Sequence, residues 1–326
     1  MGDYILDKRY RLGSIISSGG FGTVWRGTHM RTGQSVAIKI SPKIENISVL
    51  MNETRVMLYL IRSVPIPKIR AYGEFKDQSR DNYLVMDLLG DCLTYENVCK
   101  RINKDIPPSM TSREERMNRD DKNNKMYDDC NDNDNDNGDI SAYQRLLMVN
   151  IYTQLISIME GVHEAGLLYR DVKPENFLFG LQEKTQNKIH LVDFGLVKRY
   201  TSNTDHTSKS SHMKCRHGLT PIGTTNYMSV RVHLGVEASR RDDMESLAYL
   251  FYYLQYGELP WMSSHAANNL THAEYAKTKR EFRKYLAEKD GADNILRYLN
   301  IVDTYTFEDC PNYQTLRNTL SYIVLF

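Results

Sequence analysis

The stretch LLYRDVKPENFLFG, residues 167–180, constrains the fold of this chain more than any other. Both of its ends are apolar, but its middle brings together Arg170, Asp171, Lys173 and Asn176 within a few positions. A buried strand could not hold so many polar groups without partners. A solvent loop would not need large apolar side chains on both sides. The stretch therefore predicts a short polar loop that is clamped into a core, as a functional loop requires.

Length and composition limit the class of protein. The 326 residues suffice for one large domain or two lobes, and 41% hydrophobic with 25% charged residues is ordinary for a soluble globular protein. The net charge of +1 favours neither nucleic acid nor a membrane surface as a partner. We find no apolar run long enough to span a bilayer, no signal peptide and no lipidation signal. The five cysteines are odd in number and lack metal-ligand spacing, which predicts reduced thiols. We therefore expect a protein of the cytoplasm or nucleus without a membrane anchor.

The secondary-structure pattern divides the chain into two parts. The first ninety residues read mostly as strands, among them QSVAIKI, with one amphipathic helix at 49–60. Long helical patterns follow at 142–166 and 242–257, and a charged surface helix is expected at 272–289. A strand-rich front and a helix-rich back predict an α+β fold with two lobes. The expected bounds are about 1–87 for the N-lobe, 88–91 for the hinge and 92–326 for the C-lobe.

Residues 104–140 interrupt this order. They are rich in Asn and Asp and poor in core-forming residues, which predicts a disordered surface insertion. The run 128–139 carries six aspartates and no cation, so in a chain of net charge +1 the remainder carries about +7. Residues 133–144 fit the spacing of an EF-hand loop, but Asn133 and Gln144 replace its charged first and last ligands. A polar tract is therefore favoured over a calcium site.

A glycine-rich loop, SSGGFGTV at 17–24, lies between two expected strands. Its glycines allow the backbone N–H groups to approach an anion closely. Such a loop alone is more often a plain hairpin. It also departs from the GxGxxG pattern, because Ser17 takes the first glycine position. The strand VAIK then supplies Lys39, and the next helix supplies Glu53. A lysine that binds phosphates and is itself fixed by a glutamate is an arrangement for phosphoryl transfer. This context outweighs the interpretation of Glu53 as a solvated helix residue.

The loop YRDVKPEN fits the pattern H-R-D-x-x-x-x-N, with Tyr169 in place of His. Asp171 would accept the proton of a substrate hydroxyl, and Lys173 would neutralise charge on the phosphate. Asn176 and Asp193, the latter in HLVDFG, would hold Mg²⁺. Each residue has a plain alternative, such as capping a turn or ending a strand. All of them in the correct order and spacing favour catalysis.

These motifs resemble those of eukaryotic protein kinases, and R-D-x-K-P-x-N resembles the serine/threonine class. Further stretches resemble the casein kinase 1 family, namely NFLFG, DFGLVKRY, GTTNYMSVRVHLGVEASRRDDMESL and GELPW, with Ser229-Val230-Arg231 where that family has S-I-N. The resemblance covers the chain except for 104–140. It implies a bilobal kinase fold with ATP and Mg²⁺ as cofactors and a monomeric enzyme.

The resemblance also implies a nucleotide pocket between the lobes. Met86 would be the gatekeeper, and the backbone of Asp87 and Leu89 would bind adenine. Asp243 would brace the catalytic loop. The ATP-binding residues that the resemblance implies are Ile16, Ser17, Ser18, Gly19, Gly20, Phe21, Gly22, Val24, Ala37, Lys39, Met86, Asp87, Leu89, Leu178 and Val192.

The basic segment 198–218 predicts protein substrates with acidic or already phosphorylated segments. The resemblance points the same way and places Arg216 in an anion pocket, but Leu219 and His265 stand where lysines are expected. We therefore expect the acidic preference to persist and strict dependence on a primed phosphate to be reduced. A weaker hypothesis is that the acidic run 128–139 folds onto 198–218 as a pseudosubstrate.

Two other functions are possible for the same fold. A pseudokinase that acts as a binding scaffold would need a damaged catalytic set, but the whole set is present, namely Lys39, Glu53, Asp171, Lys173, Asn176 and Asp193. A small-molecule kinase is disfavoured by the full segment from Asp193 to Arg231.

Overall fold

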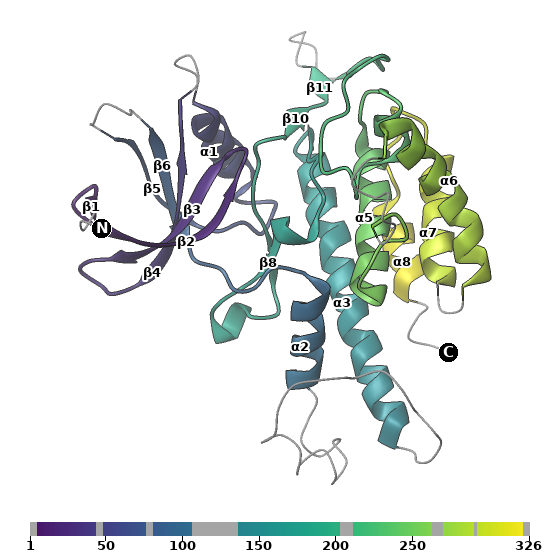
Figure 1. Ribbon diagram of the computed structural model, residues 1–326, viewed down its shortest axis with the longest axis horizontal. Coiled ribbons are helices and arrows are strands. Elements are labelled where there is room, and N and C mark those ends of the chain that lie inside the picture. Colours follow the sequence, from purple (N-terminus) through teal and green to yellow (C-terminus); the bar gives the residue numbers. More distant parts are fainter. Residues whose placement is uncertain are drawn as a thin grey trace.

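The computed structural model has two lobes, a β-rich N-terminal lobe and a helical C-terminal lobe, which lie side by side in Figure 1. This confirms the predicted α+β, bilobal fold. None of the described helices is both long and apolar enough to cross a membrane. The structure describes residues 5–43, 48–75, 81–105, 136–202, 211–262, 270–289 and 292–321.

The N-terminal lobe is a six-stranded antiparallel sheet in the order β1-β2-β3-β4-β6-β5. Its β-branched residues suit a pleated, half-buried surface, and Gly33, with φ of 70°, lies in the turn before β4. The strands are β1 Ile5–Leu6, β2 Tyr10–Gly19, β3 Gly22–His29, β4 Ser35–Ser41, β5 Ile69–Glu74 and β6 Asn82–Asp87.

Helix α1, Val49–Leu60, covers one face of this sheet (Figure 1). Ser48 caps its N-terminus, because its Oγ accepts a hydrogen bond from Met51 N at 3.0 Å. The apolar face differs from the predicted one: Leu50, Met57 and Leu60 are buried, whereas Met51 and Leu58, two of the four residues from which the amphipathic pattern is predicted, are exposed. The cap and the face together fix the position of Glu53, which is also buried.

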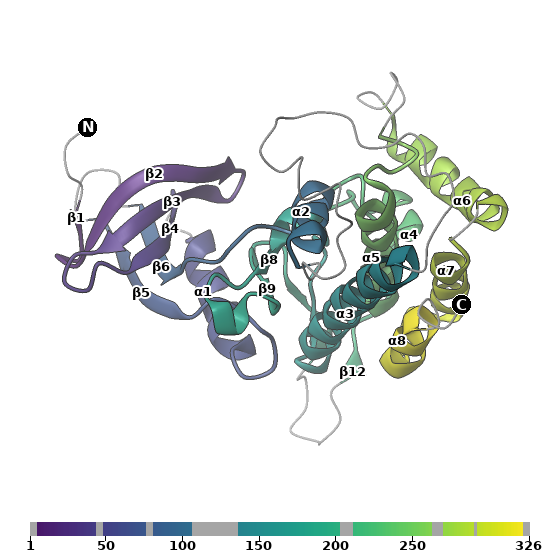
Figure 2. The same cartoon turned by 90° about the horizontal axis from the view of Figure 1, so that it is seen from below.

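The C-terminal lobe is built around α3, Asp136–Glu164, and α5, Arg240–Tyr256, which pack against each other. A capping box of Ser239 and Asp242 begins α5, and Gly257, with φ of 81°, ends it. Helices α6, α7 and α8 lie on the side away from the N-lobe (Figures 1 and 2). The remaining helices are α2 Tyr95–Asp105, α4 Val230–His233, α6 His272–Glu288, α7 Asp293–Thr304 and α8 Tyr313–Ser321.

Short strands carry the middle of the chain between these helices. A 3₁₀ turn, Pro174–Asn176, leads into the hairpin of β8, Phe177–Phe179, and β9, Ile189–Leu191. β7, Leu167–Leu168, pairs with β10, Lys198–Arg199. The polar loop 169–176 therefore lies between two small sheets whose apolar residues are buried, as the opening motif predicted.

Two expectations need adjustment. Helix α3 begins at Asp136, so the last residues of the segment 104–140 are helical. The calcium-loop and pseudosubstrate hypotheses depend largely on residues 106–135, and these lie outside the described residues. Helix α6 is not simply a charged surface helix. It buries an apolar face and also Lys279, whose exposed fraction is 0%.

Candidate active site

The predicted lysine, glutamate and aspartate meet between the lobes. Lys39 Nζ lies 2.9 and 2.8 Å from the two carboxylate oxygens of Glu53 and 3.1 Å from Asp193 Oδ1. Lys39 and Glu53 are only 6% and 3% exposed, so the ion pair is desolvated. Burial alone would lower the pKa of Lys39, but the two carboxylates raise it above its usual value. The lysine is therefore a fixed positive charge beside Asp193.

The carboxylate of Asp171 is held by three neighbours. Asn176 Nδ2 donates to Asp171 O at 2.9 Å and to Oδ2 at 3.0 Å, and Lys173 Nζ lies 2.9 Å from Oδ2. Thr224 Oγ1, from the segment before α4, donates to Oδ1 at 2.7 Å. These donors fix the orientation of the carboxylate. A base held in this way is preorganised to accept a proton.

Asp243 braces the backbone of the same loop, as expected from the sequence. Its carboxylate accepts hydrogen bonds from Tyr169 N at 2.9 Å and Arg170 N at 2.8 Å, and His163 Nε2 donates to it at 2.9 Å. Arg170 has φ of 67° and Asp193 has φ of 60°, a left-handed conformation that costs energy in residues other than glycine. The brace holds one of these two strained positions directly.

Tyr169 replaces the usual histidine and makes a contact that the sequence did not predict. Its ring is fully buried, and its hydroxyl donates to Val192 O at 2.7 Å. Val192 N in turn donates to Asn176 O at 3.0 Å. These two bonds join the polar loop to the segment that presents Asp193, so the substitution keeps both halves of the site together.

The predicted nucleotide-binding residues of the sheet share one face. Ala37 is opposite Met86, and Val24 is opposite Lys39, in neighbouring strands. Cross-strand partners point to the same side of a sheet, and so do residues two apart in a strand. Leu178, predicted for the other wall of the pocket, lies in β8 and forms an isolated bridge with Cys92. The segment after Asp87 reaches that wall through Gly90 N, which donates to Phe179 O at 2.8 Å.

The glycine-rich turn closes this face. Gly19 pairs with Gly22 and Ser17 with Val24, and a register shift places Ile16 in a bulge. Gly22 has φ of 126°, and a Cβ there would lie 2.3 Å from Ile40 O, so only glycine fits.

At the tip of the turn, the ring of Phe21 lies against Gly195. A Cβ built on Gly195 would be 3.0 Å from the nearest ring atom of Phe21. The turn therefore lies directly over the segment that contains Asp193. Of the remaining predicted residues, Gly20 lies in this turn, and Ser18 lies in β2 opposite Thr23, with its Oγ 3.1 Å from Thr23 Oγ1.

Asn176 and Asp193 are the residues that suit a metal ion. Both offer oxygen ligands, and the bond from Val192 N to Asn176 O links their segments. The described residues contain no cluster of three or more His, Cys, Asp or Glu side chains. Mg²⁺ is ordinarily held by one or two protein oxygens together with substrate phosphates and water, so the pair fits this ion.

Arg216 lies beside a cavity of about 220 Å³ that Arg170, Lys198 and Leu219 also line, and Lys39 is not among its lining residues. Its Nε and Nη2 lie 2.8 and 2.5 Å from Glu237 Oε2, and Lys198 Nζ lies 2.7 Å from Glu237 Oε1. Burial alone would raise the pKa of Glu237, but these hydrogen bonds hold it below its usual value. Nothing in the sequence indicates that an internal carboxylate pairs with Arg216.

Lys279 is a further residue that the sequence did not single out. Its Nζ donates to Thr225 O at 2.8 Å and to Met228 O at 2.7 Å, and it lies 3.0 Å from His233 Nε2. Both carbonyls belong to the turn that follows Thr224. Burial lowers the pKa of Lys279 well below its usual value. A buried lysine with two carbonyl acceptors is an internal anchor, in this case for the turn that follows Thr224, which donates to Asp171.

A buried lysine–glutamate pair, a braced aspartate and a glycine-rich turn between two lobes together define a protein kinase. In agreement, residues 10–294 match the family model of the protein kinase domain. The chain therefore belongs to the protein kinase family, and its relatives place it with casein kinase I, as the sequence motifs indicated.

Three curated relatives are each 32% identical to this chain over 318 residues, which is 97% of its length. They are casein kinase I homolog 1 and casein kinase I homolog 2 of Saccharomyces cerevisiae and casein kinase I homolog RAG8 of Kluyveromyces lactis. The chain spans about half of their length, 51%, 50% and 51% respectively.

Proposed function

We propose that this chain is an active protein serine/threonine kinase, which transfers the γ-phosphate of ATP to hydroxyl groups of proteins. The observation that carries the proposal is the meeting of Lys39, Glu53 and Asp193 within 3.1 Å beside a braced Asp171. A pseudokinase scaffold would not need this full set. Each of these groups is buried or held by hydrogen bonds, so the site is preorganised for catalysis.

Each residue then has a definite task. Asp171, fixed by Asn176 and Thr224, accepts the proton of the substrate hydroxyl. Lys173, 2.9 Å from this aspartate, is placed to neutralise charge on the phosphate. Lys39 binds the phosphates of ATP. Mg²⁺, held by Asn176 and Asp193, would supply positive charge at the phosphates.

The adenine would bind against the sheet face described above. Val24, Ala37 and Met86 form its apolar wall, and Ile16, Leu178 and Val192 would complete it. The backbone of Asp87 and Leu89 would supply the hydrogen bonds, since this segment connects the two lobes at the edge of that face.

The substrates would be acidic or already phosphorylated proteins. Arg170, Lys198 and Arg216 converge on one cavity, and Arg170 is adjacent to the catalytic Asp171. A carboxylate or phosphate of the substrate would compete with Glu237 for these cations. Because Glu237 already neutralises part of the charge and Leu219 adds none, dependence on a primed phosphate would be weak. We expect the enzyme to act as a monomer in the cytoplasm or nucleus.

Phosphate transfer to casein and to acidic peptides tests the proposal. The natural chain is compared with Asp171→Asn and Lys39→Met. Incorporation should fall by about a hundredfold or more in both variants, since each removes a group that acts in the transition state. Equal incorporation by all three proteins would refute the catalytic assignment and favour the scaffold. A phosphoserine-primed peptide and its unprimed twin test the substrate preference, and a strong primed preference would contradict the role given to Glu237.

A further inference from the structure

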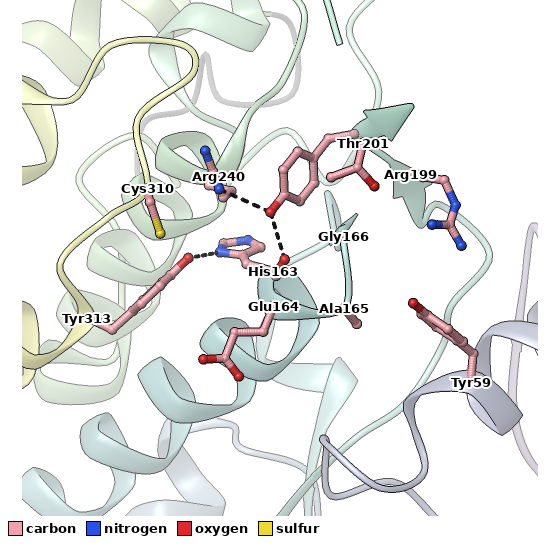
Figure 3. A pocket seen from close by; sticks show the side chains of 11 residues that line it. Tyr59, His163, Glu164, Ala165, Gly166, Arg199, Thr201, Arg240, Cys310 and Tyr313 are labelled. Atoms are coloured by element: carbon pink, nitrogen blue, oxygen red, sulfur yellow. Dashed lines mark hydrogen bonds between the residues drawn. The ribbon is translucent and has the colours of Figure 1, made fainter. Parts of the chain in front are cut away.

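A second cavity, of about 360 Å³, lies behind the catalytic loop, between α1 and the C-terminal end of α3 (Figure 3). Its volume falls in the range of ligand sites, about 300–1,000 Å³. It shares no lining residue with the substrate cavity at Arg216 or with the ATP-binding set. The side chains that decide its chemistry are Tyr59, His163, Arg199, Arg240, Cys310 and Tyr313.

Two guanidinium groups make the cavity attractive to an anion. Arg240 stacks on the ring of Tyr200 and donates to its hydroxyl at 3.1 Å, but its Nε is buried and has no hydrogen-bond partner among the described residues. A buried N–H without an acceptor costs free energy, which an incoming acceptor would recover. Arg199 is exposed and takes part in no ion pair within the described part of the chain. Glu164 is the one carboxylate of the lining, and it is exposed to solvent.

Aromatic rings supply the remaining walls. Tyr59 comes from α1, with Arg199 Cζ 5.6 Å from the centre of its ring, and Tyr313 stands on the opposite side in Figure 3. Such walls favour a flat apolar body, while the arginines favour a negative group on it. The ligand class that fits both is a small aromatic anion, such as an aryl phosphate or aryl carboxylate.

The cavity wall is connected to the catalytic loop. Tyr313 Oη is 2.8 Å from His163 Nδ1, and the other ring nitrogen, Nε2, is 2.9 Å from Asp243, the brace of the loop. Tyr200 Oη donates to His163 O at 2.8 Å, so the histidine is held through both its ring and its backbone. A ligand that touches Arg240 and Tyr313 would restrain the groups that orient His163.

The opposite wall belongs to the other lobe. Tyr59 lies on α1, the helix that carries Glu53, which pairs with Lys39. A ligand in the cavity would contact this helix and the C-lobe at the same time. It would therefore stabilise the arrangement in which the lysine–glutamate pair and the loop brace are both formed, because a ligand favours the state to which it binds better.

We propose that this cavity is a regulatory site for a small aromatic anion, whose binding increases the activity of the kinase. The site does not depend on the proposed function, but the direction of its effect does, since catalysis is the readout. Binding and activity are therefore measured separately.

Cys310, an exposed thiol of the lining, reports on the charge of the cavity. The full chain is treated with an anionic sulfonatoethyl and with a cationic trimethylammonioethyl thiosulfonate, and the rate at each cysteine is followed by peptide mass spectrometry. The anionic reagent should react about tenfold faster at Cys310, because the arginines concentrate anions. Arg199→Gln, alone and with Arg240→Gln, should reduce this preference. Cys215, whose neighbours Lys214 and Arg216 are unchanged, is the internal control.

Phenyl phosphate is the binding probe. It should protect Cys310 from labelling, whereas benzyl alcohol, which lacks the charge, and inorganic phosphate, which lacks the ring, should protect weakly. Saturating phenyl phosphate should also raise kcat/KM for an acidic peptide about fivefold, at the lower end of ordinary allosteric couplings. Both effects should be lost in Arg199→Gln, whose exposed side chain can be changed without risk to folding.

Three results would overturn the proposal. Equal labelling of Cys310 by both reagents would show that the cavity does not attract anions. Protection that survives the arginine substitutions would place the probe elsewhere. Protection with unchanged kcat/KM would remove the regulatory role. A natural chain that transfers no phosphate at all would refute the proposed function instead, and the labelling results would still decide whether the site exists.

Discussion

Replacement of Lys279 by methionine tests whether one buried lysine anchors the turn that contacts the catalytic aspartate. Methionine has a similar length and keeps the packing against the rings of Tyr249 and Trp261, which lie 4.8 and 5.0 Å from Nζ. It removes the donor to two carbonyls, those of Thr225 and Met228. The substitution therefore separates the hydrogen bonds of the side chain from its bulk.

The magnitude follows from the two carbonyls. Each buried acceptor that loses its partner costs about 1–3 kcal/mol, and removal of a buried ammonium recovers part of this. We expect a net loss of about 3 kcal/mol in the free energy of unfolding. For a chain of this size, with an unfolding entropy of about 2.1 cal/mol/K per residue, that corresponds to a fall of about 4 °C in Tm. The protein remains folded, since domains have stabilities of about 5–15 kcal/mol.

The functional consequence depends on Thr224. This residue donates to Asp171 and directly precedes the turn that Lys279 anchors, so a loosened turn weakens the contact. We expect kcat/KM for an acidic peptide to fall about tenfold, the effect of about 1.4 kcal/mol in the transition state.

Calorimetry measures the change in stability and steady-state kinetics the change in kcat/KM. Both are applied to Lys279→Met and to the control Lys284→Met. Lys284 is exposed on the same helix, so its replacement should change the free energy of unfolding by less than about 0.5 kcal/mol. If both variants melt together with the natural chain, the anchoring role is refuted. If Lys279→Met is unstable but fully active when folded, the link to the catalytic aspartate is refuted.

Three more predictions concern neighbouring contacts. Thr224→Val should lower kcat/KM at least tenfold, because a hydrogen bond to the charged Asp171 carboxylate is worth about 1.5–3 kcal/mol; peptide kinetics measure this. Burial lowers the pKa of His233 to about 3, so its contribution to stability is complete above pH 6.5 and is lost as the pH falls toward 3. Between pH 7 and pH 5 urea titration should show the natural chain losing about 2 kcal/mol more than His233→Gln. Tyr313→Phe removes the hydrogen bond to His163. It should lower the free energy of unfolding by about 1 kcal/mol, measured by urea titration, and kcat about threefold, measured by peptide kinetics.

The contrary outcomes are distinct. Thr225→Val, which changes the adjacent threonine and leaves the Thr224 hydroxyl in place, should have little effect; an equal loss in both would mean that β-branching and not the hydroxyl matters. A pH dependence that is the same with and without His233 would assign it to other groups. A Tyr313→Phe variant with normal stability and kcat would show that His163 needs no second partner.

The sequence predicted those parts of the fold and site that depend on local order. Helix α1 runs over the expected residues, because the Ser48 cap and the apolar spacing are local signals. Lys39 and Glu53 are fourteen positions apart and were recognised through the motif that contains them, and the structure brings them together. In such cases the residue type and spacing carry the information.

Contacts between distant segments could not be predicted in this way. Thr224 meets Asp171 across fifty-three positions, and the hydroxyl of Tyr169 meets Val192 because two loops approach each other. A lysine on a charged helix is ordinarily exposed, so Lys279 was included in a surface helix. Its burial depends on carbonyls and rings supplied by other elements, and no local pattern reports them.

The chain from Tyr313 through His163 to Asp243 has a consequence for biosynthesis. Asp171 and its neighbours leave the ribosome early, but the last partner of the brace lies in α8, near the end of the described chain. At ordinary rates of about 5–20 residues per second, the synthesis of the intervening segment takes on the order of 10 s. A nascent chain therefore carries all of its catalytic side chains for some time before their support is complete. Full phosphate transfer would be reached only when α8 docks, which separates synthesis of the active site from its full activity.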